Sequence, residues 1–157
     1  MKIKNWKTYG IWILITEAVG ALSGLLSKNG MDIYTSQIVQ PPLSPPAILF
    51  PIVWIILYAL MGISAARIYL SAPSQARSMG LNLFAVQLVV NFFWSLIFFN
   101  AQAFGFAFFW LMLLWVLVIS MILTFRRVDP LAAVLQVPYL LWLTFAAYLN
   151  AGVWYLN

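Results

Sequence analysis

The chain has 157 residues, of which 65% are apolar and only 7% are charged, whereas a soluble domain carries about 25% charged residues. Eight Lys or Arg and three Asp or Glu residues are too few to cover a water-soluble surface, because the rest would be contiguous apolar area. The absence of Cys and His excludes disulfides, thiol chemistry, zinc sites and catalytic triads with a His base. We therefore expect a single integral membrane domain over residues 1–157, with no metal site.

Five apolar runs are long enough to cross a bilayer, which takes about 20 helical residues. They cover residues 9–26, 46–69, 81–100, 104–125 and 130–155. These runs predict an all-α membrane protein, a bundle of five transmembrane helices. The first run also has the basic start of a signal peptide, but its length and Glu17 within it argue against cleavage.

Residues 28–45 are the longest polar segment, and we expect them to form a loop. Four prolines lie within residues 41–46, and because Pro lacks an N–H and favours extended backbone, this loop should be stiff. Pro51 and Pro138 fall inside the second and fifth runs, where we expect them to kink the helices. The short turn at residues 100–102 predicts an antiparallel hairpin of the third and fourth helices.

The basic residues predict the orientation of the chain. If the N-terminus is cytoplasmic, the outer side holds only Lys28. The cytoplasmic side then holds Lys2, Lys4, Lys7, Arg67, Arg77, Arg126 and Arg127. This excess places the N-terminus in the cytoplasm and the C-terminus outside. Because these charges separate apolar runs and form no water-exposed patch, they indicate contact with the lipid bilayer and no nucleic-acid partner.

Three tryptophans from three predicted helices lie at one depth. At 1.5 Å per residue, Trp54, Trp94 and Trp142 all come out about 10–12 Å from the outer face, deeper than the interface where Trp anchors helices. Aromatic and polar residues share their helix faces, namely Tyr58, Gln87, Asn91, Tyr139, Ala146 and Leu149. One interpretation is a cavity that stacks a flat apolar ligand. The other is ordinary helix packing, with Asn91 bonding across helices.

Glu17 is the only carboxylate inside an apolar run and lies near mid-membrane. Intramembrane acids are functional candidates. No Lys or Arg is expected at its depth, so we expect Glu17 to be protonated or hydrogen-bonded to neutral groups. A proton relay through Glu17 is one hypothesis. Gly20-x-x-x-Gly24 allows a close helix contact, either within the bundle or in a homodimer.

Three ordered segments of the chain resemble the TspO/MBR family, the translocator proteins also called peripheral benzodiazepine receptors. The first is Pro41-Pro42-Leu43-Ser44-Pro45-Pro46 with Phe50, Val53-Trp54 and Leu57 to Gly62 after it. The second is QLVVNFFWSLIFF over residues 87–99, and the third is PYLLWLTFAAYLN over residues 138–150. The resemblance covers most of the chain from about residue 40 onward.

The resemblance implies a five-helix bundle whose outer half, lidded by the Pro-rich loop, binds porphyrins and drug-like aromatic molecules of the benzodiazepine and isoquinoline type. Protoporphyrin IX would be a ligand, and no cofactor is implied. The residues of this chain that match the family's drug and porphyrin pocket are Trp54, Tyr58, Asn91, Trp94, Trp142, Phe145, Ala146 and Leu149. Further candidate ligand-binding residues are Tyr34, Gln40, Pro42, Phe50, Gln87 and Tyr139.

One departure from the animal members lies at the end of the fifth helix. Val153-Trp154-Tyr155 is followed only by Leu156 and Asn157, so the basic residue of the animal cholesterol motif is missing. Such motifs are weak even when complete. The departure favours a bacterial cell membrane over a mitochondrial one and argues against tight cholesterol binding.

Three functional hypotheses remain open at this point. The first is a porphyrin-binding membrane protein that acts in porphyrin sensing, transport or degradation. The second is an enzyme that degrades porphyrin with light and oxygen, an activity that the resemblance to some bacterial family members implies. Trp54 and Trp142 would then be its catalytic residues. The third is a proton-coupled transporter of small molecules that uses Glu17.

Overall fold

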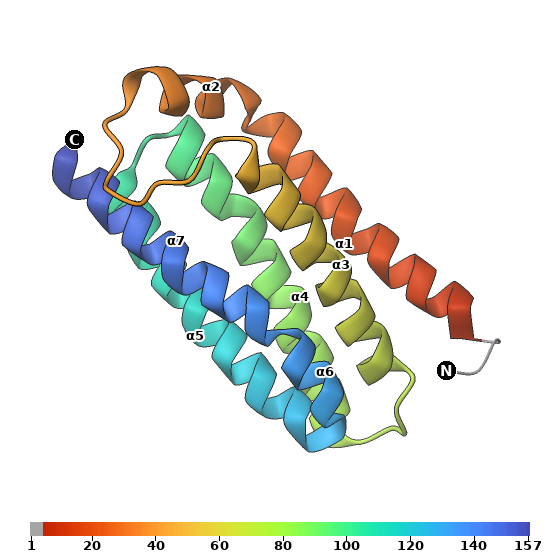
Figure 1. The fold of residues 1–157 in the computed structure, drawn as a ribbon. Helices are drawn as coiled ribbons and strands as arrows, with labels where there is room; N and C mark the ends of the chain where they lie inside the picture. Colours follow the sequence, from red (N-terminus) through yellow and green to blue (C-terminus); the bar gives the residue numbers. More distant parts are fainter. Residues whose placement is uncertain (1–4) are drawn as a thin grey trace.

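The computed structural model describes residues 5–157, and Lys2 and Lys4 of the orientation prediction lie outside these residues. Within them, five helical segments are long and apolar enough to cross a membrane. They are α1 (Trp6–Leu26), α3 (Leu49–Tyr69), α4 with its π-helical continuation η2 (Gln75–Ser95 and Leu96–Asn100), α5 (Phe104–Val128), and α6 with α7 (Pro130–Leu135 and Val137–Leu156). The predicted all-α bundle of five membrane helices is confirmed (Figure 1).

Because the number of spans is odd, the start of α1 and the end of α7 lie at opposite ends of the bundle (Figure 1). We call these ends the α6 end, where α1 starts, and the α2 end. α5 packs along α4, as the short turn between them predicts, and also against α6 and α7. At the α6 end, Arg67 Nε donates a 2.7 Å hydrogen bond to Asp129 Oδ2, which ties α3 to the start of α6.

The segment predicted as one long loop begins with a helix. α2 spans Lys28–Gln37, so the expectation of a loop over residues 28–45 was wrong for these ten residues. They contain no Pro, and Tyr34 buries its ring against Phe98 and Phe99. The helix is therefore stabilised by packing onto α4's continuation, which polarity along the sequence does not reveal. The Pro-rich stretch after Gln37 is the remaining loop.

The two prolines expected to kink helices act differently. α3 begins at Leu49, so Pro51 lies in its first turn, where a missing N–H breaks no helical hydrogen bond. The kink expected at Pro51 was therefore wrong. Pro138 stands in the first turn of α7, and the span is interrupted at Gln136 between α6 and α7.

α1 changes its packing partner along its length. Near the α6 end it lies on α3, where Thr16 Oγ1 donates a 2.7 Å hydrogen bond to the Tyr58 carbonyl. Near the α2 end it lies on α4 and η2, where Ser23 Oγ donates to the Phe92 carbonyl at 3.2 Å and Asn100 Nδ2 donates to the Leu26 carbonyl at 2.8 Å. This crossing leaves space between α1, α3 and α7 in the α2 half of the bundle.

Candidate functional site

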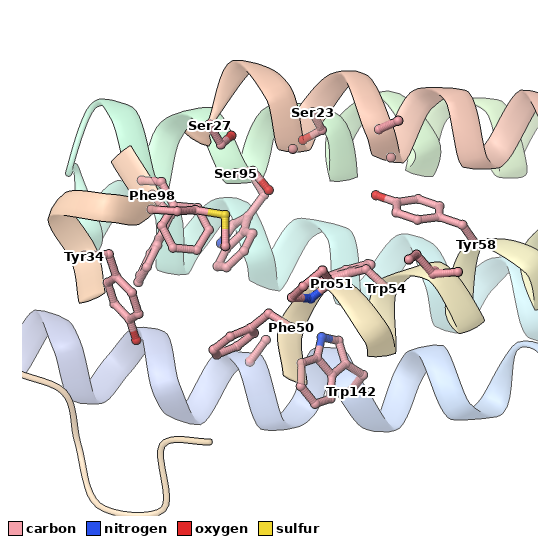
Figure 2. Close-up of a pocket in the computed structure, with 18 of the residues that line it drawn as sticks. Ser23, Ser27, Tyr34, Phe50, Pro51, Trp54, Tyr58, Ser95, Phe98 and Trp142 are labelled. Atoms are coloured by element: carbon pink, nitrogen blue, oxygen red, sulfur yellow. The ribbon is translucent and has the colours of Figure 1, made fainter. Parts of the chain in front are cut away.

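A cavity of about 430 Å³ occupies the space that α1 leaves in the α2 half of the bundle (Figure 2). Eight aromatic side chains from five elements line it: Tyr34, Phe50, Trp54, Tyr58, Trp94, Phe98, Phe99 and Trp142. Polar groups are few and come from Glu17, Ser23, Ser27, Ser95 and Asn150. The cavity thus has the mostly apolar wall with a few polar groups that is typical of small-molecule sites.

The helical repeat of α3 places three rings of this wall in one row. Phe50, Trp54 and Tyr58 follow one another at intervals of four residues, which puts them on one face of the helix. The rings of Trp54 and Tyr58 are 5.4 Å apart between centroids and tilted by 31°. Trp142 on α7 meets Phe50 edge-on at 6.0 Å. Figure 2 shows Phe50, Trp54 and Trp142 facing Ser23 of α1 and Ser27, which follows α1, across the cavity.

The three tryptophans expected at one depth all reach this cavity. Trp94 donates its indole N–H to Asn150 Oδ1 at 3.2 Å and stacks on Phe98 at 5.0 Å. Among residues 5–157, no hydrogen-bond partner is found for the indole N–H of Trp54 or of Trp142. Two hydrogen-bond donors in the wall are therefore available to a ligand.

α1 contributes a face of small residues. A Cβ atom at Gly20 would overlap the ring of Tyr58, so only glycine allows the two helices to approach this closely. A Cβ atom at Gly24 meets nothing within 4 Å, because this position faces open space. The Gly20-x-x-x-Gly24 spacing predicted a close helix contact either within the bundle or in a homodimer. Gly20 makes a contact within the bundle.

Asn91, Gln87 and Tyr139 do not line the cavity but form a network behind its wall. Tyr58 Oη donates to Asn91 Oδ1 at 3.2 Å, and Asn91 Nδ2 donates to Tyr139 Oη at 2.7 Å. Tyr139 Oη in turn donates to Gln87 Oε1 at 2.8 Å. Asn91 of α4 therefore bonds to side chains of α3 and α7, as the interpretation of ordinary helix packing predicted. Its hydrogen bond with Tyr58 also fixes the position of that side chain in the cavity wall.

Three further predicted residues, Gln40, Pro42 and Phe145, are not among the residues that line the cavity. The Pro42 carbonyl accepts a 2.7 Å hydrogen bond from Tyr148 Oη, and Gln40 Nε2 donates to the Tyr34 carbonyl at 3.5 Å. Phe145 stacks on Tyr148 with ring centroids 6.2 Å apart. The hydrogen bond from Tyr148 holds the Pro-rich loop against α7, whereas Gln40 bonds to α2 and the contact of Phe145 lies within α7. The other candidates, Tyr34, Phe50, Trp54, Tyr58, Trp94, Trp142, Ala146 and Leu149, do line the cavity.

Several lining residues were not singled out as candidate ligand-binding residues from the sequence. Phe98 lies four residues after Trp94, so helical spacing alone could have found it. Phe99 lines the cavity as well because the π-helix η2 lets two adjacent rings face it. The sequence contains no pattern that predicts this π-helix. Ser23 and Ser27 share the face of Gly20 and Gly24, a stripe of small residues that the spacing does show.

Tyr34 closes the cavity from the side of α2. Its ring is 5% exposed and lies 5.5 Å from Phe98 and 5.3 Å from Phe99 between centroids. Burial raises the pKa of the Tyr34 hydroxyl above its usual value, so this group stays neutral. Within the part of the chain that the structure describes, no three acidic side chains come together to hold a metal ion.

Comparison of the sequence with known proteins identifies the family of the chain. The family model described as the TspO/MBR family matches residues 12–156. The chain belongs to the TspO/MBR family. The match spans α1 to α7, so nearly the whole bundle of this TspO/MBR protein, including every element that lines the cavity, lies within the family's sequence pattern.

Bacterial and animal proteins are among its relatives. The tryptophan-rich protein TspO of Chlorobaculum tepidum is 35% identical over 155 residues, which is 98% of each chain. Protein CrtK of Rhodobacter capsulatus is 35% identical over 95% of this chain and 92% of its own. The translocator protein of Ovis aries is 38% identical over 73% of this chain and 69% of its own. With its five apolar spans, this TspO/MBR chain is an integral membrane protein.

Proposed function

We propose that this protein is a membrane receptor for flat aromatic ring systems, with protoporphyrin IX as the tetrapyrrole ligand and benzodiazepine- or isoquinoline-type molecules as smaller ligands. The observation that carries the proposal is the convergence of eight aromatic side chains on one cavity of about 430 Å³. Aromatic faces stack on flat rings, and cavities of about 300–1,000 Å³ suit ligands of drug size. The indole N–H groups of Trp54 and Trp142 would orient a ligand carbonyl or ring nitrogen.

The orientation of the chain supports a ligand site near the outer face. In the structure, Lys7, Arg67, Arg77, Arg126 and Arg127 lie at the α6 end, and Lys28 lies at the α2 end. Under the positive-inside rule the α6 end faces the cytoplasm. We therefore place the cavity in the outer half of a bacterial cell membrane, with the Pro-rich loop over it.

Tryptophan fluorescence titrated with protoporphyrin IX tests the proposal. We compare the parent protein with a Trp54→Phe/Trp142→Phe double variant, which removes both free indole donors of the wall. The matched control is Trp6→Phe/Trp154→Phe, because these two tryptophans are 59% and 48% exposed on the outside of the bundle. We expect about tenfold weaker binding for the cavity variant and about parental binding for the control. Equal affinity of all three proteins would show that the ligand binds elsewhere.

A second candidate function is light-dependent degradation of the bound porphyrin. The observation that favours it is the position of Trp54 and Trp142 in the wall against which a stacked ring would lie. Dioxygen would be the oxidant and the porphyrin the compound oxidised, with the two indoles placed to exchange an electron with the excited ring. Illuminated samples should then lose porphyrin absorbance faster with the parent protein than with Trp54→Phe or Trp142→Phe. The same loss without protein would remove this function.

A third candidate, proton-coupled transport, is favoured by the position of Glu17 in the cavity wall. It requires ligand flux into proteoliposomes that depends on an imposed pH gradient and that Glu17→Gln abolishes. Binding without flux would leave the receptor function and exclude transport.

A further inference from the structure

A second hollow, of about 370 Å³, lies open on the outer surface of α4 and shares no lining residue with the aromatic cavity. We call it the α4 hollow. Its lining residues are, in chain order, Gln75, Ser78, Met79, Asn82, Leu83 and Val86. The first two are polar and lie at the α6 end, where α4 begins, and the last two are apolar and lie further into the span (Figure 1). This order matches a molecule with a polar head and an apolar tail.

The polar side chains of the α4 hollow have no partner within the protein. Gln75, Ser78 and Asn82 are exposed, and among residues 5–157 their side chains form no hydrogen bond. Asn82 follows Gln75 by seven residues, which is about 10 Å along the helix axis. Polar groups on the lipid-facing side of a membrane helix are costly unless they find a partner. A partner from outside the chain would therefore stabilise this face.

Arg127 of α5 borders the α4 hollow. Thr124 Cγ2 lies 3.6 Å from the point that a Cβ atom at Gly80 would occupy, so these two sides of α5 and α4 face each other. Leu83, which lines the hollow, follows Gly80 by three residues and lies on the same side of α4. Arg127 follows Thr124 by three residues on α5. Because the two helices are antiparallel, Arg127 is about level with Ser78.

The chain supplies no anion to Arg127. Of its three acidic residues only Asp129 lies at the α6 end, and the carboxylate of Asp129 is paired with Arg67. Within the described residues, Arg127 has neither a salt-bridge partner nor a hydrogen-bond partner. Under the positive-inside rule this end faces the cytoplasmic leaflet, where anionic lipids attract basic side chains. A lipid phosphate at this level would pair with Arg127 and accept a hydrogen bond from Ser78.

We propose that the α4 hollow binds one phospholipid with an anionic headgroup, whose phosphate pairs with Arg127 while an acyl chain lies along Leu83 and Val86. This site is on a different face from the aromatic cavity, so it does not depend on the proposed function. Arg126 provides a comparison within the same helix. It is exposed as well, but it follows Thr124 by two residues and so lies about 200° around the helix from it, on the far side from the hollow.

Native mass spectrometry of the detergent-solubilised protein tests the proposal. Phosphatidylglycerol and phosphatidylcholine with the same acyl chains are titrated into the parent protein and into Arg127→Gln. The matched control is Arg126→Gln, which makes the same change in net charge one residue away. A further variant, Ser78→Phe, fills the hollow. Its control is Val89→Phe, at an exposed position of α4 outside the hollow.

We expect the parent protein to bind its first phosphatidylglycerol about fivefold more tightly than its first phosphatidylcholine. Arg127→Gln should remove this preference and Arg126→Gln should keep it. Ser78→Phe should weaken the first binding step of both lipids about fivefold, and Val89→Phe should not.

Equal binding of the two lipids by the parent protein would overturn the inference, and so would the same loss of preference in both arginine variants. A lipid-free dimer that Ser78→Phe separates would also overturn it, because a second copy of the chain would then cover this face. The comparison of the two lipids in the parent protein decides even if a variant does not fold.

Discussion

The hydroxyl of Tyr58 donates a 3.2 Å hydrogen bond to Oδ1 of Asn91, which joins the cavity wall on α3 to a buried network on α4 and α7. The ring of Tyr58 faces the cavity on one side and the glycine face of α1 on another. The side chain therefore belongs both to the candidate site and to the core.

Replacing Asn91 by Leu should destabilise the fold. The Tyr58 and Tyr139 hydroxyls would lose their amide partner in a buried environment, and unsatisfied buried groups cost about 1–3 kcal/mol. The matched control is Asn82→Leu, at an exposed position of the same helix. Thermal unfolding in detergent should show a lower midpoint for Asn91→Leu alone. Equal midpoints for both variants would show that the network contributes nothing to stability.

The two glycines of α1 should respond differently to alanine. Gly20→Ala forces a methyl group into the ring of Tyr58, so α1 must shift and both stability and ligand affinity should fall. Gly24→Ala meets open space and should gain up to about 1 kcal/mol from the better helix propensity of Ala. Thermal unfolding of the two variants checks this directly. A loss of stability at Gly24 as large as that at Gly20 would contradict the arrangement.

A large residue at Ala146 should abolish ligand binding by filling the cavity. Ala146 lines the cavity from α7 and is 7% exposed, so Ala146→Phe places a ring where the ligand would lie. Leu141→Phe is the matched control, because Leu141 is 65% exposed on the outside of the same helix. We expect at least about a tenfold loss of protoporphyrin affinity for Ala146→Phe only. Undiminished binding by a folded Ala146→Phe protein would place the ligand elsewhere.

Asp129 should stabilise the protein mainly as a helix cap. Its Oδ1 accepts a 3.1 Å hydrogen bond from the Leu131 backbone N–H at the start of α6, while Oδ2 pairs with Arg67. Asp129→Asn keeps the capping oxygen and removes only the charge, which we expect to cost at most about 1 kcal/mol because Arg67 is 32% exposed.

Asp129→Ala removes both interactions and should cost about 1–2 kcal/mol more, the usual value of an N-cap. Chemical unfolding of the two variants separates the contributions. If Asn were as destabilising as Ala, the ion pair and not the cap would dominate.

The five spans could be predicted from the sequence because a bilayer imposes one length on every apolar helix. A common depth of Trp54, Trp94 and Trp142, which all line one cavity, was predicted for a related reason, since expected depth follows from the constant rise per residue. The direction in which each side chain points could not be read in the same way. In a membrane protein the lipid-facing and buried faces are both apolar, so hydropathy does not report how a helix is rotated.

Asn91 and Phe99 illustrate this limit. Asn91 shares a helix face with Trp94, yet its amide turns to Tyr139 behind the wall, because a buried network satisfies it there. Phe98 follows Trp94 at helical spacing, but its direct neighbour Phe99 also lines the cavity, at a place where η2 is a π-helix.

The sequence by itself determined that the protein is a five-helix membrane protein, and it predicted a common level for the three tryptophans that line the cavity. Only the tertiary structure decided which groups face the cavity, since that depends on α1 crossing from α3 to α4 and on α2 covering the gap. It also placed Glu17 in the cavity wall. The physical reason is that span length and depth follow from local chain geometry, whereas the rotation and crossing of helices follow from packing between distant segments.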